Sequence, residues 1–266
     1  MTHDTTLGVS SFSSVHPEAI IGENVTISPF VTIDKNVIIG DGTCIYPHAV
    51  IFEGARIGKN CRIFPGAVIS GIPQDLKFVG EETTCEIGDN TTVRECATIS
   101  RGTASKYKTI VGSDCLLMAY SHTAHDCILK DHVILGNATQ LAGEVEVDDY
   151  AILSGGTLVH QFSRIGKHAM IQGGSRVSKD IPPYIIAGRE PLTYSGVNII
   201  GLRRRGFTTE QIAGIQEIYR ILYQSGLNNS AAVKHMEASI PDGVEKQEVI
   251  NFIINSQRGI IRGYLE

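Results

Sequence analysis

An aliphatic residue recurs at every sixth position over more than half of the chain. Counting in steps of six from Val15 to Val177, 24 of 28 positions are Val, Ile or Leu. An α-helix repeats near 3.6 residues and a half-buried strand every two, so neither explains this period. A period of six is typical of a repeat that stacks parallel strands into a β-helix. We therefore predict a rod-like β-helix over residues 1–190, with the repeats starting near residue 12.

A second, smaller inward position accompanies each aliphatic one. Small or β-branched residues stand four positions after most aliphatic slots, as Ala49 and Thr139 do. Two inward positions of unequal bulk allow stacked layers to close around a narrow core. Four of the six cysteines occupy this smaller position, namely Cys61, Cys85, Cys115 and Cys127. We expect them to be small buried hydrophobes rather than disulfide partners or zinc ligands.

Two segments leave the repeat without losing its phase. They cover residues 71–84 and 101–109, and they contain three of the four broken slots. Loops that project from a rigid scaffold often carry function. For the second segment, a solvated loop is an equally simple interpretation.

The repeat ends after Val177, and residues 191–266 are predicted to form a small α-helical C-terminal domain. A capping box at Thr208 and helical spacing from Ile212 to Leu222 predict one helix. Two more are expected, from about Ser230 to Ser239 and from Asp242 to about Ser256.

Composition narrows the class of protein without identifying an activity. The net charge is −5 and the sequence pI is about 6.0, so the composition gives no sign of a basic surface for nucleic acid. No secretory signal is visible, and no run approaches the roughly 18 apolar residues of a membrane helix. We expect a cytoplasmic protein without an integral membrane segment.

The residues most suited to catalysis lie where the repeat is interrupted inside the rod. Thr123 occupies an aliphatic slot between His122 and the pair His125-Asp126. If a coil contains eighteen residues, His125 lies over Gly143. Imidazole titrates near neutrality, Asp126 is adjacent, and the Gly143 amide could stabilise an oxyanion, so His125 is a candidate general base.

Other interpretations of these residues remain open. A lone histidine in a core-facing pattern is more often packed and hydrogen-bonded than catalytic. Some proteins with this repeat bind zinc through three histidines, and His122, His125 and His160 could be compared with them, although a separation of two coils suits convergent ligands poorly. The same eighteen-residue step aligns Asn137, Gly155 and Gly173, which make either a smooth groove for an extended chain or a set of ordinary turns.

Several motifs together resemble one enzyme family, the UDP-N-acetylglucosamine O-acyltransferases of lipid A biosynthesis, which are hexapeptide-repeat acyltransferases. The motifs are His122-Thr123-Ala124-His125-Asp126-Cys127, Leu141-Ala142-Gly143, Val159-His160-Gln161-Phe162, Gly196-Val197-Asn198, Gly201-Leu202-Arg203-Arg204-Arg205-Gly206-Phe207 and Gln74-Asp75-Leu76-Lys77. The resemblance covers nearly the whole chain. It implies a mainly β fold, a left-handed parallel β-helix of triangular section with three hexads per coil.

The resemblance also implies a reaction. A (R)-3-hydroxyacyl chain would pass from acyl carrier protein to the 3-hydroxyl of UDP-N-acetylglucosamine. His125 would act as general base, Asp126 would orient it, and the Gly143 amide would hold the oxyanion. No cofactor or metal is expected beyond the phosphopantetheine of the carrier protein, and the family forms homotrimers with active sites between neighbouring rods.

Further roles follow from the same resemblance. Gly173 would set the acyl-chain length, and a glycine there favours a long chain. Contacts to the sugar, diphosphate or acyl chain are implied for Asp75, Lys77, His122, His160 and Gln161, and contacts to the nucleotide and phosphates for Asn198, Arg204 and Arg205.

Four positions depart from the family pattern, namely Ser100, Glu144, Gln172 and Ile200. They leave open the acyl length and whether the acceptor is instead a 3-amino UDP-sugar. Another hexapeptide-repeat acyltransferase or a metal-binding protein of this fold is the remaining alternative.

Overall fold

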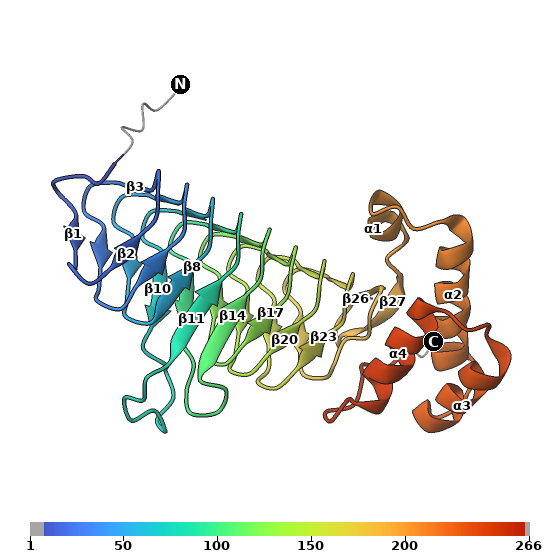
Figure 1. Ribbon diagram of the computed structural model, residues 1–266. Helices are drawn as coiled ribbons and strands as arrows, with labels where there is room; N and C mark the ends of the chain where they lie inside the picture. The colour runs from blue at the N-terminus through green and yellow to red at the C-terminus, as the bar shows by residue number, and fades with distance from the viewer. Residues whose placement is uncertain (1–7, 264–266) are drawn as a thin grey trace.

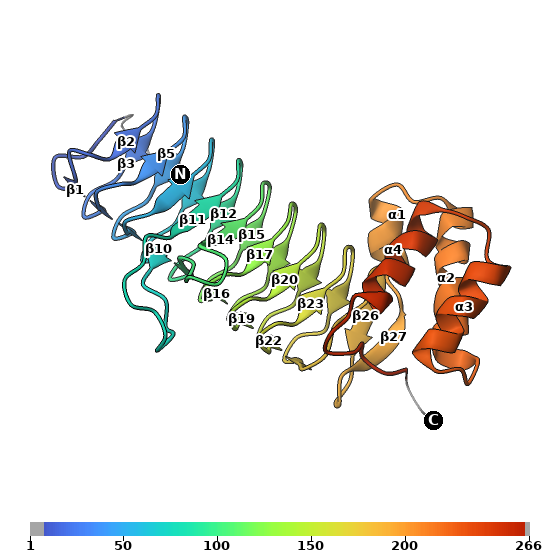
Figure 2. The same ribbon diagram turned by 60° about the horizontal axis from the view of Figure 1, so that its bottom comes forward.

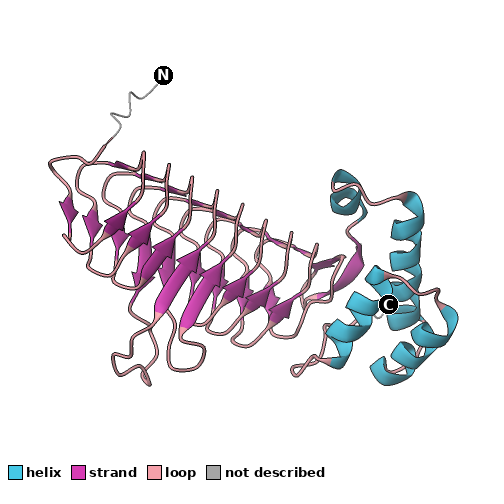
Figure 3. Ribbon diagram, in the orientation of Figure 1, coloured by secondary structure: helices cyan, strands magenta, loops and turns pink. Residues whose placement is uncertain are grey.

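The protein is a long rod with a bundle of helices at one end (Figure 1). This computed structural model describes residues 8–263. The rod is a left-handed parallel β-helix and the end bundle is α-helical, so the predicted mainly β fold class is confirmed. Figure 3 separates the two parts by colour, with strands along the rod and helices gathered beyond it.

Three sheets form the three sides of the rod, and within the described residues all strand pairs but the last are parallel. The first sheet contains β1 (Ser14–Val15), β4 (Thr32–Ile33), β7 (Val50–Ile51), β10 (Val68–Gly71), β13 (Thr98–Ser100), β16 (His122–Thr123), β19 (Gln140–Leu141), β22 (Leu158–Val159) and β25 (Arg176–Val177). The second contains β2 (Ile20–Ile21), β5 (Ile38–Ile39), β8 (Ala55–Ile57), β11 (Thr84–Ile87), β14 (Lys108–Val111), β17 (Ile128–Leu129), β20 (Glu146–Val147) and β23 (Arg164–Ile165). The third contains β3 (Thr26–Ile27), β6 (Cys44–Ile45), β9 (Arg62–Ile63), β12 (Thr92–Val93), β15 (Leu116–Leu117), β18 (Ile134–Leu135), β21 (Ile152–Leu153), β24 (Met170–Ile171), β26 (Ile185–Gly188) and β27 (Thr193–Val197).

The strands pair at the predicted step of eighteen residues. His122 pairs with Gln140, and Gln140 with Leu158. The step lengthens only at the two loop segments: Val68 pairs with Thr98, thirty residues on, and Thr98 with His122, twenty-four on. These steps exceed eighteen by two hexads and by one hexad, which explains why the period of six keeps its phase.

The chain turns three corners in each coil. We call the turn from the first sheet to the second the first corner, the turn from the second to the third the second corner, and the turn back to the first the third corner. Both loop segments leave the rod at the first corner, one between β10 and β11 and the other between β13 and β14. Figures 1 and 2 show both loops projecting from the same edge of the rod.

The core of the rod follows the predicted pattern. Aliphatic residues of the six-residue repeat fill it, and Cys61, Cys85, Cys115 and Cys127 are free and buried as expected. Burial raises the pKa of the Cys127 thiol to about 12, which keeps it a neutral thiol. Thr123 is also completely buried, so the broken slot points inward.

The helical end contains α1 (Ile199–Arg204), α2 (Thr209–Gln224), α3 (Asn229–Ser239) and α4 (Val244–Ile254). The capping box at Thr208 is present, and the three predicted helices occur close to their expected bounds. The sequence pattern missed α1 and the antiparallel pair β26–β27, and the proposed division after residue 190 lies in the turn between these two strands. Lys167 of the rod forms an ion pair of 2.6 Å with Glu248 of α4, which joins the bundle to the rod.

Candidate active site

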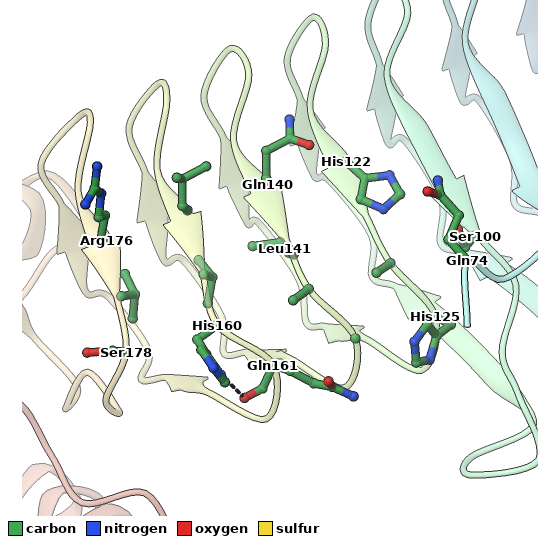
Figure 4. Close-up of a pocket in the computed structure, with 16 residues that line it drawn as sticks. Gln74, Ser100, His122, His125, Gln140, Leu141, His160, Gln161, Arg176 and Ser178 are labelled. Atoms are coloured by element: carbon green, nitrogen blue, oxygen red, sulfur yellow. Dashed lines mark hydrogen bonds between the residues drawn. The ribbon is translucent and has the colours of Figure 1, made fainter. Parts of the chain in front are cut away.

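A groove of about 580 Å³ runs along the outer face of the first sheet to the first corner (Figure 4). It is lined by Gln74, Ser100, His122, Ala124, His125, Gln140, Leu141, Ala142, Gly143, Leu158, Val159, His160, Gln161, Arg176, Val177 and Ser178. The first loop, the first corner and five successive coils therefore share one surface. Five residues predicted for the site, His122, His125, Gly143, His160 and Gln161, line this groove.

His125 lies at the first corner between β16 and β17, and its side chain packs against Gly143 of the next coil. A Cβ atom built on Gly143 would lie 2.5 Å from His125 Cε1, so only glycine leaves room for the imidazole. This confirms the predicted stacking of His125 over Gly143. His125 is 8% exposed, which places the ring at the edge of the groove rather than in open solvent.

Asp126 holds the other side of the imidazole. Its Oδ2 lies 2.8 Å from His125 Nδ1. The Asp126 side chain is fully buried and accepts three more hydrogen bonds: Oδ1 from the Thr103 and Lys106 amides, and Oδ2 from the Thr103 hydroxyl. Burial opposes ionisation of Asp126, but these hydrogen bonds outweigh it and lower the pKa of Asp126 below its ordinary value.

This network assigns the tautomer of His125. A carboxylate with four donors around it is an acceptor only, so the hydrogen between Asp126 and His125 belongs to Nδ1. The lone pair of neutral His125 then lies on Nε2, on the opposite side of the ring. That arrangement is the one a general base needs, because the carboxylate orients the imidazole and stabilises its protonated form.

The first loop brings a second carboxylate to the same ring. Asp75 Oδ2 lies 3.8 Å from His125 Nε2. Its neighbour Gln74 lines the groove, while Lys77 is exposed on the loop and its amide donates to Asp75 Oδ1 at 2.9 Å. Of the two predicted residues of this loop, Asp75 therefore lies at the site, and Lys77 supports it through its backbone.

His122 and His160 also line the groove. His122 precedes Gly143 in the sequence, and His160 follows it. His122 Nδ1 lies 2.7 Å from Thr98 Oγ1, and burial together with the nearby His125 lowers the pKa of His122. Both effects favour the neutral form of His122. His160 is exposed, and its Nδ1 lies 3.0 Å from the Gln161 carbonyl oxygen.

The Gly143 amide is the candidate oxyanion donor. Residues 8–263 provide no hydrogen-bond acceptor for this N–H, whereas the adjacent Glu144 amide donates to the His125 carbonyl. A free amide beside a general base is suited to bind an oxygen that gains negative charge.

The remaining predicted site residues lie elsewhere, at α1 and at the third corner of the rod. Asn198 caps α1 and donates to the His168 carbonyl at the second corner, where Arg205 donates to the Tyr150 carbonyl at 3.2 Å. Arg204 is exposed on α1. Gly173 lies at the third corner, stacked on Gly155 as predicted: a Cβ on Gly173 would lie 3.1 Å from the Gly155 carbonyl oxygen. A single chain therefore does not bring these four residues to His125.

Some groove residues were missed, and the repeat contained the signal for three of them. Gln140, Leu158 and Arg176 follow His122 at steps of eighteen and share its outward position on the first sheet. Counting outward residues in the same way as inward ones would have found them. The sequence also missed Thr103 and Lys106, which hydrogen-bond to Asp126. They had no such signal, because they lie in the second loop.

The described part of the chain contains no group of three or more His, Cys, Asp and Glu residues placed to hold a metal ion. None of its helices is long and apolar enough to span a membrane.

Comparisons by sequence find related proteins. Residues 180–261 match a family described as UDP N-acetylglucosamine O-acyltransferase, domain 2, and residues 10–113 match the GMPPB C-terminal domain. The acyl-[acyl-carrier-protein]–UDP-N-acetylglucosamine O-acyltransferase of Burkholderia lata is 43% identical over 199 residues, covering 73% of this chain and 76% of the relative.

Solved structures extend the similarity to the whole fold. The UDP-N-acetylglucosamine acyltransferase of Bacteroides fragilis is 58% identical and superposes with a TM-score of 0.95, covering 96% of this chain and 100% of that one. The corresponding protein of Acinetobacter baumannii is 39% identical with a TM-score of 0.93, covering 96% and 99%. The chain therefore belongs to the UDP-N-acetylglucosamine O-acyltransferase family.

Proposed function

We propose that the protein transfers a (R)-3-hydroxyacyl chain from acyl carrier protein to the 3-hydroxyl of UDP-N-acetylglucosamine, the first step of lipid A biosynthesis. The observation that carries this proposal is the His125-Asp126 pair beside the free Gly143 amide. The names of the relatives support acyl carrier protein and UDP-N-acetylglucosamine as substrates. The (R)-3-hydroxyacyl chain and the sugar 3-hydroxyl are what the family resemblance implies. Those relatives are O-acyltransferases, which favours a sugar hydroxyl over a 3-amino group as the acceptor.

The chemistry follows from the tautomer of His125. Its Nε2 accepts the proton of the sugar 3-hydroxyl as the oxygen attacks the thioester carbonyl. The carbonyl oxygen becomes an oxyanion that accepts a hydrogen bond from the Gly143 amide. When the intermediate collapses, the C–S bond breaks, and the imidazolium returns the proton to the departing thiolate.

We assign the other residues to substrate binding. Asp75 and Lys77 of the first loop, with His122, His160 and Gln161 of the groove, contact the sugar, diphosphate or acyl chain. Asn198, Arg204 and Arg205 bind the nucleotide and phosphates, which suits the planar, multiply donating guanidinium.

These two sets lie at different corners of one rod, so a second copy of the chain must supply one of them. A homotrimer with sites between neighbouring rods satisfies that requirement. The proposed enzyme is cytoplasmic and needs no cofactor or metal of its own, since the donor carries its own phosphopantetheine.

Gly173 is proposed to limit the acyl chain. The stacked glycines at the third corner leave the backbone open there, which favours a long chain. Replacing Gly173 with Met should shift the preference toward shorter donors by several carbons, measured by mass spectrometry of products from a mixed donor pool. An unchanged length profile would remove this assignment.

Transfer from 3-hydroxyacyl carrier protein to UDP-N-acetylglucosamine tests the proposed function directly. The parent should form the O-acyl product, and His125→Ala should lose about 10²- to 10⁴-fold in kcat, the usual contribution of general-base catalysis. A 3-amino UDP-sugar offered in parallel should be the poorer acceptor. No product from the parent, or an unimpaired His125→Ala variant, would contradict the proposal.

A further inference from the structure

The second loop places one side chain against the buried carboxylate of the site. Thr103 is 7% exposed and holds Asp126 through two atoms: its amide donates to Oδ1 at 3.0 Å, and its hydroxyl to Oδ2 at 2.6 Å. Asp126 Oδ2 is also the atom that accepts from His125 Nδ1. The Thr103 hydroxyl and the catalytic imidazole therefore converge on one oxygen.

The direction of the Thr103 hydroxyl is fixed from both sides. The Ser105 amide donates to Thr103 Oγ1 at 3.2 Å, which occupies a lone pair of that oxygen. The single hydroxyl hydrogen is then free to point at Asp126, an acceptor-only carboxylate. A charge-assisted hydrogen bond of this length is among the stronger kinds in proteins.

The backbone of the loop is shaped to deliver this contact. Residues 102 and 108 approach so closely that a Cβ on Gly102 would lie 2.2 Å from the Lys108 nitrogen. The Tyr107 amide donates to the Thr103 carbonyl at 2.7 Å, and the Lys106 amide reaches Asp126 Oδ1 at 3.1 Å. The Lys106 side chain also connects the loop to the rod, because its Nζ lies 3.2 Å from Glu146 Oε1 on the second sheet. The loop is thus closed on itself and anchored to the rod at the position of Asp126.

We infer that Thr103 is a positioning residue for the reaction. By hydrogen-bonding Oδ2, it fixes the rotation of the Asp126 carboxylate and keeps that oxygen an acceptor, which holds the hydrogen of His125 on Nδ1 and the lone pair on Nε2. The inference rests on the proposed function for its kinetic consequence. Its structural content, the control of the His125 tautomer, does not depend on which acyl acceptor is used.

The test compares Thr103→Val, which keeps the shape and removes the hydroxyl, with Thr103→Ser, which keeps the hydroxyl. Thr103→Val should lower kcat about 10- to 100-fold, the cost of a lost hydrogen bond to a buried charge, with KM for UDP-N-acetylglucosamine within threefold. Thr103→Ser should recover at least a third of the parent kcat. Ser105→Ala is the matched control, because this neighbouring side chain is exposed and the Ser105 amide is retained.

Nitrogen-15 spectra of the histidine rings provide the readout that a merely structural role would not move. In the parent, His125 should be the Nδ1–H tautomer, and Thr103→Val should show a mixture of tautomers while its thermal unfolding remains cooperative. In an Asp126→Asn background, Thr103→Val should change the spectrum no further. A Thr103→Val variant with parental kcat and a pure Nδ1–H tautomer would overturn the inference, as would an equal loss of kcat in Thr103→Ser.

The same experiment separates this inference from the proposed function. If the parent transfers no acyl chain but its His125 tautomer responds to Thr103→Val, the proposed function fails and the positioning role stands. If the parent is active and neither kcat nor the tautomer responds, the positioning role fails alone.

Discussion

Asp126 at the first corner of the rod and the pair His168 and Arg205 at the second corner differ in how their buried polar atoms are hydrogen-bonded. At the first corner, Asp126 is fully buried and every hydrogen bond it needs comes from residues of its own chain. At the second corner, His168 Nδ1 and Arg205 Nη1 are buried without a hydrogen-bond partner among residues 8–263. The buried carboxylate of Asp126 is therefore fully hydrogen-bonded within a single chain, whereas His168 and Arg205 have unused hydrogen-bonding capacity.

The second corner is also distinguished by stacked aromatic rings. At the second corner a column of rings stacks along the rod, with centroid separations of 4.4 Å for His132–Tyr150, 4.9 Å for Tyr150–His168 and 5.6 Å for His168–Tyr184. Arg205 lies over the Tyr150 ring at 5.3 Å. A stack of aromatic rings with unpaired polar atoms suits binding, whereas a fully bonded carboxylate suits chemistry that needs one fixed geometry. The comparison predicts large rate effects at the first corner and affinity effects at the second.

The largest effect should come from Asp126→Asn. Its side-chain oxygen can still accept from the Thr103 and Lys106 amides, but its amide nitrogen would then donate to His125 Nδ1 and place the ring hydrogen on Nε2. We expect kcat to fall about 10³-fold with KM within threefold, since the wrong tautomer cannot act as a base. Steady-state kinetics check this, with a thermal melt to confirm folding. A loss below tenfold would break the contrast between the corners.

Gly143→Ala should have the next largest effect. The new methyl group would lie 2.5 Å from His125 Cε1, so the imidazole must move. We expect kcat to fall about 10²-fold, because a displacement near 1 Å at a reacting group has roughly this cost. Gly214→Ala in α2 is the matched control, since its Cβ would meet open space and should leave kcat unchanged. Equal kcat for both variants would show that the close approach at Gly143 is unimportant.

Arg205→Lys tests the second corner. Lysine keeps the charge but loses the planar group that stacks on Tyr150 and donates to its carbonyl. We expect KM for UDP-N-acetylglucosamine to rise about tenfold and kcat to stay within threefold. The exposed Arg203, replaced by Lys, is the control. A fall in kcat without a change in KM would assign Arg205 to the chemistry and remove the distinction between the corners.

The smallest effect concerns stability below neutral pH. Burial, together with the charges of Arg205 and Lys167, lowers the pKa of His168 from 6.5 to about 4. The unfolded chain therefore binds this proton more readily, and the stability contributed by neutral His168 is present above pH 6.5 and is lost as the pH falls from 6.5 toward 4. Between pH 7 and 5 the parent should lose about 1 to 2 kcal/mol more than His168→Phe in urea unfolding. Identical pH dependence in the two proteins would contradict this.

The rod was predictable because each coil repeats the same local rule. The inward positions from Val15 to Val177 predicted where the strands lie. With a coil of eighteen residues, they also predicted the stacking of His125 on Gly143. The same rule placed Thr123 in the core. Nothing comparable exists beyond Val177, where the period stops, and this is why α1 and the β26–β27 pair were missed.

Spacing alone predicted the site only where it lies on the repeat, whereas Asp75 of the first loop came from the family resemblance. His122, His125, Gly143, His160 and Gln161 share the groove because their spacing follows the coils. The contact between Thr103 and Asp126 depends on how a loop folds back, and a single threonine in a loop carries no periodic signal. The separation of Asn198 and Arg205 from His125 could not be predicted either, because the order of motifs along the chain does not tell which corner a residue occupies.

The linear order of the coils has a consequence for how the molecule loses structure. Each strand of the first sheet pairs only with the strands before and after it, and β16, beside His125, is sixth of nine. In such a one-dimensional array, opening begins at the ends of the array and advances coil by coil. The coil that contains His125 therefore has several coils on each side that can open before it. Amide hydrogen exchange should be fast in the outer coils before it reaches His125, so partial melting and loss of the active site are separate events.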